Sequence, residues 1–154
     1  KDLGYVGEID NINPQIINQL VAGGYIPVIA PVGGNDQGES FNINADTVAG
    51  GLATALEAEK LIFLTDVDGI REEQDNEDSQ ISSLDVSEAS DWINDGRIQG
   101  GMVPKVNACM QAVKKGVHKT HILNGLVSHA LLLEIFTDKG IGTMIVKEGG
   151  NKDG

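Results

Sequence analysis

Residues 41–47, Phe41-Asn42-Ile43-Asn44-Ala45-Asp46-Thr47, lie between two apolar runs and decide the expected fold. Asn44 is a favourable helix N-cap, and Asp46 falls in the first turn of the helix that should follow, where a carboxylate suits the positive helix end. The apolar runs at residues 25–32 and 60–67 have the length and branching of buried strands. Strand, helix and strand in this order predict a right-handed crossover unit of a parallel α/β sheet.

Such a crossover predicts where polar side chains gather. Asn42, Asp46, Asp66 and Asp68 would share the rim at the carboxyl ends of the strands, where open α/β sheets bind ligands. These carboxylates could ligate Mg²⁺ or organise lysines. Helix capping and turn formation are the commoner uses of Asp at such places, and the pattern alone leaves both uses open.

Composition limits the classes of partner. The 154 residues, 40% of them hydrophobic, suit one ordinary domain with one core. A net charge of −12 argues against nucleic acid or an anionic membrane surface, although local amides and single lysines can still bind a small phosphate ligand. The single cysteine, Cys109, excludes an internal disulfide and fits a reducing compartment. No apolar run approaches the ~20 residues of a membrane span.

The rest of the chain alternates predicted helices and strands. Helices are expected after Asn13-Pro14, after Ser87, and across residues 102–115 and 130–136; strands are expected at 120–123 and 142–146. Residues 33–39 have the composition of a hairpin tip, and residues 71–80 that of a solvated surface loop. Residues 148–154 are expected to form a tail.

The stretch from Gly100 to Lys105 is a candidate anion site. A glycine pair runs into a helix N-terminus that carries a lysine in its first turn, and backbone amides, helix dipole and ammonium together suit a phosphate. The alternative is a glycine linker before a helix whose lysine is merely solvated. The spacing is not that of a P-loop, and no Ser or Thr follows Lys105.

Other familiar sites are not supported by the sequence. His118, His121 and His129 lack the spacing and partners of a zinc site, so no protein-held metal is expected there. Cys109 lies on the apolar face of its predicted helix and is expected to be a core thiol rather than a nucleophile. No GxGxxG follows a strand, so a dinucleotide-binding Rossmann domain is not indicated.

Three motifs, taken in order, resemble the amino acid kinase family: residues 42–46, 64–69 and 100–105. Further similar stretches lie at residues 3–8, 25–30, 129–134 and 136–143, and the resemblance runs from Lys1 to about Val146. It is closest to family members that phosphorylate N-acetyl-L-glutamate in arginine biosynthesis. The fold it implies is a three-layer αβα sandwich on an open, mainly parallel sheet.

The resemblance implies an activity and a set of site residues. The activity is transfer of the ATP γ-phosphoryl to the γ-carboxylate of N-acetyl-L-glutamate, with Mg²⁺ bridging the ATP phosphates largely through water. Asn42 corresponds to a substrate-binding position, Asp46 to the carboxylate that orients active-site lysines, and Lys105 to a lysine that stabilises the transferring phosphoryl. The positions that correspond to the nucleotide site are Thr65, Asp66, Gly69, Gly100 and Gly101.

A second site is implied for the arginine-inhibited members of the family. His121, Glu134 and Gly140 match an L-arginine effector site in residue type and mutual spacing, and a carboxylate can accept the guanidinium fork in two hydrogen bonds. Ordinary strand and helix surface is the alternative for His121 and Glu134. Leu126 departs from the basic residue that is usual in the family just after the glycine at Gly125, and Asn124 stands in place of the usual Asp.

The resemblance also implies an organisation. Residues 1–40 correspond to the end of a substrate-binding lobe, and residues 41–147 to an ATP-binding lobe. Homo-oligomers, either dimers or arginine-sensitive hexamers, are expected, as is a cytoplasmic or, in a photosynthetic eukaryote, plastid-stroma location. Regulated members also bind the nitrogen-signalling PII protein.

Some groups that the family uses are not present in the sequence. A second catalytic lysine, a Gly-Gly phosphate loop and a substrate-binding arginine belong to an N-terminal half that would precede Lys1, so the 154 residues alone are expected to have no kinase turnover. Two alternatives remain open. One is another family member, such as a carbamate, glutamate or uridylate kinase; the other is a non-catalytic nucleotide- or arginine-binding module.

Overall fold

The computed structural model describes residues 4–73, 76, 79–137 and 140–150. Its elements are, in order, α1 (Gln15–Ala22), β1 (Val32–Gly34), β2 (Ser40–Asn42), α2 (Ala45–Ala55), β3 (Lys60–Thr65), β4 (Ser83–Asp85), α3 (Val86–Asn94), α4 (Met102–Lys114), β5 (Lys119–Asn124), α5 (Ala130–Phe136) and β6 (Thr143–Val146). No helix among these is long and apolar enough to cross a membrane.

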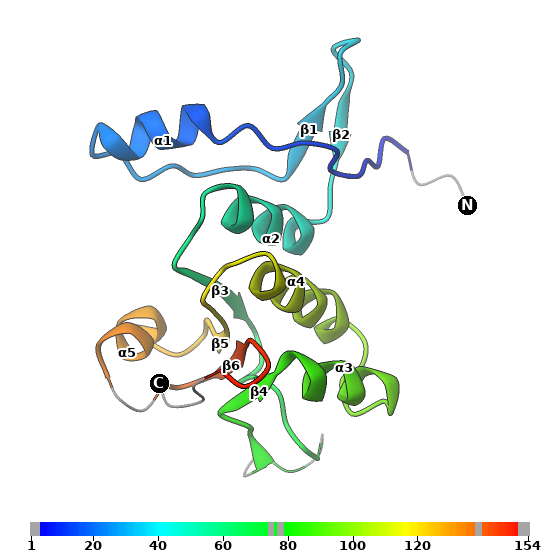
Figure 1. Cartoon of the computed structure of the whole chain (residues 1–154), viewed down its shortest axis with the longest axis vertical. Helices are drawn as coiled ribbons and strands as arrows, with labels where there is room; N and C mark the ends of the chain where they lie inside the picture. Colours follow the sequence, from blue (N-terminus) through cyan, green and yellow to red (C-terminus); the bar gives the residue numbers. More distant parts are fainter. Residues whose placement is uncertain (1–3, 74–75, 77–78, 138–139, 151–154) are drawn as a thin grey trace.

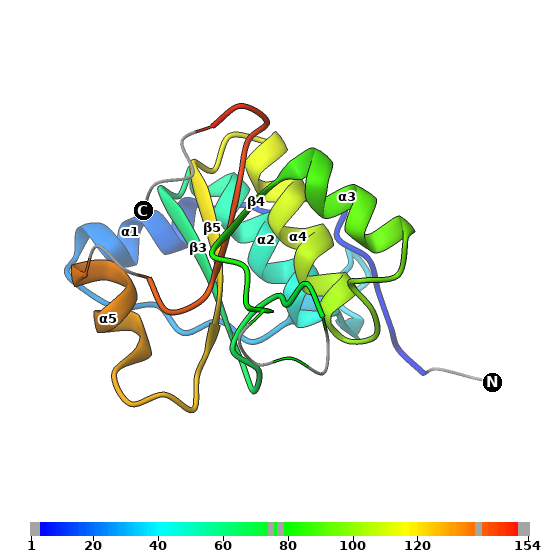
Figure 2. The same ribbon diagram turned by 90° about the horizontal axis from the view of Figure 1, so that it is seen from below.

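Four of the strands form one sheet in the order β3-β5-β6-β4. The pairs β3–β5 and β4–β6 are parallel and β5–β6 is antiparallel, so the sheet is mixed but mostly parallel. Helices α2, α3 and α4 cover one face, and α5 lies on the other (Figures 1 and 2). The expected α/β class and the three-layer arrangement are confirmed.

The hydrophobic core lies between the sheet and the face made by α2, α3 and α4. Every second strand residue enters it, because side chains alternate between the two faces of a sheet. Helix α4 contributes most, since Val106, Cys109 and Val113 are at most 3% exposed. Burial raises the pKa of the Cys109 thiol to about 12, so this cysteine is the expected core residue and not a nucleophile.

The first expected strand is wrong. Residues 25–30 form no strand, and the regular strand begins only at Val32, where β1 pairs antiparallel with β2 in a separate two-stranded sheet. Ile26 and Val28 are 90% and 96% exposed. The crossover unit is therefore absent from the described residues, because a parallel strand needs a neighbour to pair with and the segment has none there.

Other local predictions agree better with the structure. Asn44 caps α2 by accepting a hydrogen bond from the Thr47 amide. Residues 35–39 form the hairpin tip between β1 and β2, whereas Gly33 and Gly34 belong to β1 itself. Helix α3, however, begins at Val86 and not after Ser87: Asp85 is the N-cap and makes a reciprocal capping box with Glu88.

Two expected segments lie partly outside the described residues. Of the surface loop at residues 71–80, residues 74–75 and 77–78 are not described; Arg71 and Gln80 close the loop through an isolated antiparallel bridge. Of the tail, residues 151–154 are not described. The boundary expected between residues 40 and 41 falls inside β2.

Thr143, at the start of β6, is hydrogen-bonded to the chain segment that follows β3. It is fully buried; its hydroxyl accepts from the Ile70 amide at 2.8 Å and donates to the Ile81 carbonyl at 2.6 Å. Gly69, just before Ile70, has φ +133°, and a Cβ there would lie 2.7 Å from Thr143 Oγ1. One hydroxyl thus fixes two loop segments at the edge of the sheet.

Replacing Thr143 by Val should lower the free energy of unfolding by about 1–3 kcal/mol, because it leaves a buried amide and a buried carbonyl without a partner. Urea denaturation followed by circular dichroism measures the change. Thr143→Ser is the matched control: it keeps the hydroxyl and removes one methyl group, and should cost about 0.8 kcal/mol. Equal losses in the two variants would contradict the assigned role of the hydroxyl.

Candidate active site

Chain topology brings the N-termini of α2 and α4 to the same edge of the sheet. Helix α2 leads through a short turn into β3, and α4 leads through a short turn into β5. Strands β3 and β5 are parallel, with Thr65 opposite Asn124 at their carboxyl ends. Each helix runs back against its strand, so both helix N-termini face this carboxyl edge (Figure 1).

Asp46 and Lys105, one from the first turn of each helix, form an ion pair at this edge. Lys105 Nζ lies 3.1 Å from both carboxylate oxygens of Asp46. The side chains are 16% and 23% exposed, so the pair is partly shielded but still reachable from solvent. Residues 59 positions apart in the sequence are thus held together at one edge of the sheet.

The start of α4 offers fewer free amides than its sequence suggests. The Met102 amide donates to the Gln99 carbonyl at 3.2 Å and the Val103 amide to the Gly100 carbonyl at 3.3 Å. Pro104 has no amide hydrogen. Gly100 has φ +57°, and a Cβ on Gly101 would meet no atom within 4 Å, so the glycine pair borders open space. Lys105 is therefore the principal anion-attracting group of this helix start.

A pocket of about 210 Å³ adjoins this helix start. It lies between the segment after β3 and the segment before α4, and its lining residues are Val67, Gly69, Ile70, Arg71, Arg97, Ile98, Gln99 and Met102. Arg97 stacks over the Trp92 ring at 4.1 Å and holds Asp95 through its Nε at 2.9 Å. Its guanidinium is thereby fixed at the pocket wall.

The end of β3 is bound to the end of β5 by polar side chains. Asn124 Nδ2 donates to Asp68 Oδ1 at 2.7 Å, and Arg71 pairs with the other oxygen at 3.2 Å. The Asn124 hydrogen bond, followed by Arg71, holds the pKa of Asp68 below its usual value. An Asp in place of Asn124 would set two carboxylates against each other, so the departure seen in the sequence has a local physical reason.

The remaining nucleotide-site candidates on β3 lie beside this network. Thr65 Oγ1 donates to Asp66 Oδ1 at 3.2 Å, and the Thr65 carbonyl accepts from the Gly125 amide. Neither residue lines the pocket, whereas Gly69 does. Asn42 is exposed at the end of β2, two residues before the cap of α2, and its backbone pairs with the N-terminal segment through Tyr5 and Gly7.

No group of three or more His, Cys, Asp or Glu side chains suited to a metal ion occurs in the described part of the chain. Asp46 is paired with Lys105, and Asp68 with Asn124 and Arg71. A cation at this edge would thus be held mainly by ligand oxygens and water, which is how proteins commonly hold Mg²⁺ with a nucleotide.

His121, Glu134 and Gly140 meet on the opposite face of the sheet. His121 neighbours Ile122, which points into the core beneath α4, so His121 points the other way, toward α5. Its Nδ1 lies 2.6 Å from Glu134 Oε1 without the alignment of a hydrogen bond, and it is only 4% exposed. Burial lowers the pKa of His121, although the nearby Glu134 opposes this, so the imidazole is neutral at pH 7.

Glu134 is held from two further directions. The Ile141 amide donates to its Oε2 at 2.9 Å, and a Cβ on Gly140 would lie 2.7 Å from the same oxygen. Gly140 therefore makes room for the carboxylate. The side chains of His121 and Glu134 are buried and Gly140 is exposed beside them, and the three residues lie apart from the Lys105–Asp46 pair.

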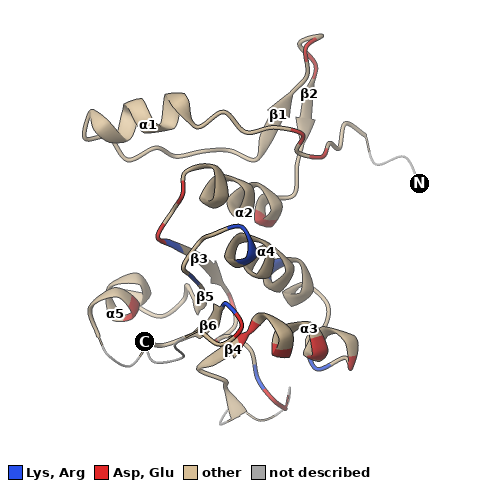
Figure 3. Ribbon diagram, viewed as in Figure 1, with Lys and Arg blue, Asp and Glu red and all other residues tan. Residues whose placement is uncertain are grey.

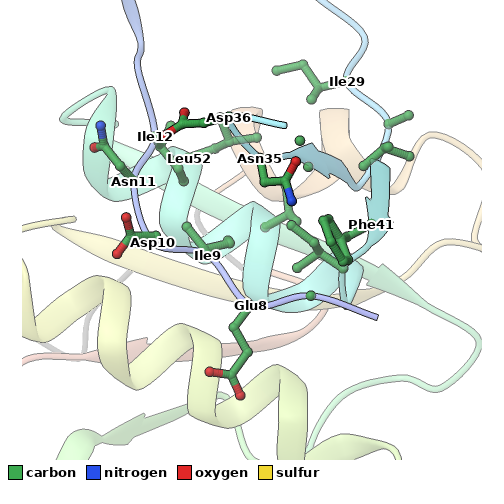
Figure 4. Close-up of a pocket in the computed structure, with 17 residues that line it drawn as sticks. Glu8, Ile9, Asp10, Asn11, Ile12, Ile29, Asn35, Asp36, Phe41 and Leu52 are labelled. Carbon is green, nitrogen blue, oxygen red and sulfur yellow. The ribbon is translucent and has the colours of Figure 1, made fainter. Parts of the chain in front are cut away.

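A larger hollow lies away from both clusters, with a volume of about 740 Å³. It is bordered by residues 7–12, the β1–β2 hairpin and α2, and Figure 4 shows a mixed lining in which apolar side chains such as Ile9 and Phe41 alternate with polar ones such as Asp10 and Asn35. It contains none of the residues expected to act on a substrate. Size alone therefore does not identify the active site in this chain.

Several contacts escaped sequence reasoning. The capping box of Asp85 and Glu88 was detectable, since an Asp three residues before a Glu at a helix start is its signature. Thr143, Asn124 and the stacking of Arg97 on Trp92 carried no such local signal, because each depends on a partner that the fold alone brings near.

Comparison with known proteins gives one family. The model of the amino acid kinase family matches residues 1–124. The acetylglutamate kinase of Halothermothrix orenii is 64% identical over 147 residues, which cover 96% of this chain and 51% of that protein. That of Moorella thermoacetica is 56% identical and is covered to 49%. The chain thus spans about half the length of these curated relatives.

Comparison with solved structures agrees with this family assignment. N-acetylglutamate synthase from Neisseria gonorrhoeae, complexed with coenzyme A and L-arginine, matches 96% of this chain and 34% of its own at 31% identity and a TM-score of 0.85. Carbamate kinase from Giardia lamblia, bound to AMP-PNP, shares the fold at 24% identity and a TM-score of 0.63, with 86% and 44% covered. With a family model that matches four-fifths of its residues, this chain belongs to the amino acid kinase family.

Proposed function

We propose that the chain is the nucleotide-binding part of an acetylglutamate kinase, which transfers the γ-phosphoryl group of ATP to the γ-carboxylate of N-acetyl-L-glutamate. The observation that carries the proposal is the pairing of Lys105 with Asp46 at the carboxyl edge of the sheet, beside a pocket of about 210 Å³. The curated relatives of that name, 50–64% identical, support the substrate.

Phosphoryl transfer needs charge neutralisation and positioning rather than a covalent nucleophile. In this proposal the Lys105 ammonium neutralises the transferring phosphoryl group, and Asp46 holds the ammonium at a fixed place without removing its charge. Asn42, at the mouth of α2, donates hydrogen bonds to the acetylglutamate. Lys105 and Asp46 reach one edge of the main sheet from two helix starts, and Asn42 ends β2 two residues before the cap of α2.

The nucleotide would lie with its base in the pocket lined by Gly69, Arg97 and Met102, and with its phosphates toward Gly100, Gly101 and Lys105. Thr65 and Asp66 would border the phosphates at the end of β3. Mg²⁺ enters with ATP and supplies charge neutralisation at the phosphates; the scarcity of free carboxylates at the edge fits such a water-rich site.

The proposal separates binding from turnover. The chain offers one lysine at the candidate site, and the family's second lysine and glycine-rich phosphate loop have no counterpart in the 154 residues. Donors that stabilise a transition state typically contribute about 2.7–4 kcal/mol each. Nucleotide binding by this chain, rather than turnover, is thus the direct test.

Replacing Lys105 by Met should weaken binding of a non-hydrolysable ATP analogue at least about tenfold, or about 1.4 kcal/mol, because the phosphates lose their nearest ammonium. Titration calorimetry in the presence of Mg²⁺ measures the affinity for the analogue.

The matched control for this substitution is Lys114→Met, in the last turn of the same helix and exposed to solvent. It removes the same charge from the far end of α4 and should leave the affinity within twofold. Equal affinity of the Lys105 variant and the wild type would refute the proposed site, and absence of binding by the wild type would refute the proposed function.

A second binding function, for L-arginine, is supported by one observation: His121, Glu134 and Gly140 converge around a buried carboxylate. A carboxylate with little solvent suits a guanidinium, which can donate two parallel hydrogen bonds to it. The solved synthase that matches 96% of this chain was crystallised with L-arginine. We propose the same ligand for this cluster, with PII and oligomer formation as further proposals that rest on the family alone.

Replacing Glu134 by Gln should abolish measurable binding of L-arginine, because the uncharged amide turns a donor toward the guanidinium. Calorimetry with L-arginine, and with L-citrulline as the uncharged ligand, measures the effect. Glu59→Gln, at an exposed position before β3, is the control and should bind as the wild type does. Arginine binding that survives in the Glu134 variant would place the ligand elsewhere.

His121 should make the fold less stable in mild acid. Its folded pKa lies below the unfolded value of about 6.5, so below that pH the unfolded chain binds the additional proton and gains stability relative to the fold. Between pH 6.5 and 5.5 the free energy of unfolding should fall by less than about 1.4 kcal/mol, since one full proton corresponds to about 1.4 kcal/mol per pH unit. Urea unfolding at the two pH values measures it.

The informative comparison for this acid effect is His121→Asn, which removes the titrating group and should flatten that part of the stability profile. His118→Asn, at an exposed position, should leave the profile as in the wild type. An unchanged profile in the His121 variant would show that other groups cause the acid sensitivity.

A further inference from the structure

The pocket of about 210 Å³ is lined by both arginines of the chain. Arg71 and Arg97 are the only arginines among the 154 residues, and they come from different segments of the sequence. Figure 3 shows basic and acidic residues next to each other on the ribbon around α3 and β4. Each guanidinium is paired with its own carboxylate, Arg71 with Asp68 and Arg97 with Asp95. The two arginines therefore add little net charge to the pocket wall.

The turn after α3 places Arg97 over the ring of Trp92. Helix α3 ends at Asn94, and Gly96, with φ +83°, turns the chain back. The Ile98 amide then donates to the Trp92 carbonyl at 2.9 Å. Because this hydrogen bond holds the segment against the helix, the Arg97 guanidinium lies 4.1 Å from the centroid of the Trp92 ring.

The Arg97 guanidinium is held in orientation as well as in place. Asp95 binds its edge, since Nε lies 2.9 Å and Nη2 2.5 Å from Asp95 Oδ2. The indole of Trp92 beneath it is only 9% exposed. The Arg97 side chain nevertheless remains 37% exposed and lines the pocket. A flat group, supported by a buried aromatic ring, is thus presented to the pocket.

The size and charge of this pocket favour a flat, uncharged group over a phosphate. Pockets that enclose a whole drug-sized ligand measure about 300–1,000 Å³, so a volume of about 210 Å³ suits a single ring system. A phosphate would have to compete with Asp68 and Asp95 for the two guanidinium groups. A nucleobase, in contrast, stacks on the plane of a guanidinium and leaves its edge with the carboxylate.

We propose that Arg97 is the surface on which the base of the bound nucleotide stacks, and that Trp92 and Asp95 are positioning residues for its guanidinium. This inference rests on the proposed function, because it names the group that holds the base in the proposed nucleotide site. The stack runs from the buried indole through the guanidinium to the base, while Lys105 attracts the phosphates of the same ligand. The contact depends on the plane of the side chain and not on its charge alone, so a lysine cannot replace it.

Arg97→Lys is the direct test, because it keeps the positive charge and removes the plane. It should weaken binding of the non-hydrolysable ATP analogue at least about fivefold, which is the lower end of the cost of losing one base stack. Titration calorimetry in the presence of Mg²⁺ measures the affinity. Thermal unfolding of the variant should match that of the wild type, since the Arg97 side chain is partly exposed.

Asp95→Ala tests the positioning of the guanidinium. Without this carboxylate Arg97 must be ordered at the moment of binding, which should weaken binding of the ATP analogue about two- to tenfold. The matched control is Asp91→Ala, which removes the same charge from an exposed position one turn earlier and leaves Trp92 and Asp95 in place. The control variant should bind the analogue as the wild type does.

Trp92 provides a readout that needs no substitution. It is the only tryptophan of the chain, so tryptophan fluorescence reports on this site alone. We expect the emission of the wild type to change when the ATP analogue saturates the chain. It should stay constant with tripolyphosphate, which carries the phosphates without a base.

The outcomes separate this inference from the proposed function. Analogue binding that is unchanged in Arg97→Lys overturns the stacking role and leaves the proposed function intact. The same conclusion follows if the emission of Trp92 ignores the analogue or responds equally to tripolyphosphate. Equal affinities of the Asp95 and Asp91 variants overturn the positioning role of Asp95. A wild-type chain that binds no nucleotide overturns the proposed function and this inference together.

Discussion

The ion pair between Lys105 and Asp46 depends on nearly every other feature of the fold. Two helices must begin at one edge of the sheet, which requires β3 and β5 to be parallel and each helix to run back along its strand. The core beneath α4 sets the depth of Lys105, because Val106 and Cys109, its near neighbours in sequence, are fully buried. A shift of either helix by one residue would separate the two charges, so the ion pair depends on the positions of both α2 and α4 along the sheet.

The edge around this pair is built from short polar contacts between segments distant in sequence. Thr143 is hydrogen-bonded to the backbone of Ile70 and of Ile81, and Asn124 is hydrogen-bonded to Asp68. The carboxyl ends of β3 and β5 and the start of β6 are thus joined by side-chain hydrogen bonds. Each contact joins two segments that are distant in sequence. These contacts border the pocket that Gly69 and Met102 line, and a wall held by such contacts lowers the ordering cost of binding a ligand.

Sequence patterns predicted most of the helices and the strands β3, β5 and β6, and the misses have physical reasons. Helix α2 with its Asn44 cap, helix α4 with its buried Val106 face, and strand β5 follow from local periodicity and capping. The meeting of Asp46 with Lys105 was implied by the family resemblance and not by any local pattern. Strand β4, at three residues, is too short to leave a periodic signal, and the N-cap Asp85 was passed over in favour of Ser87.

The error at residues 25–32 has a different origin. An apolar, β-branched run specifies that a segment prefers burial between neighbours, but it does not say which chain supplies them. Val28 is almost fully exposed because no described residue lies against it, while Ile122, with a similar pattern around it, is completely buried between β3 and β6. The same preference is thus satisfied in β5 and unsatisfied in residues 25–30. An apolar run thus predicts that a segment can form a strand, whereas its pairing depends on neighbours that local sequence does not specify.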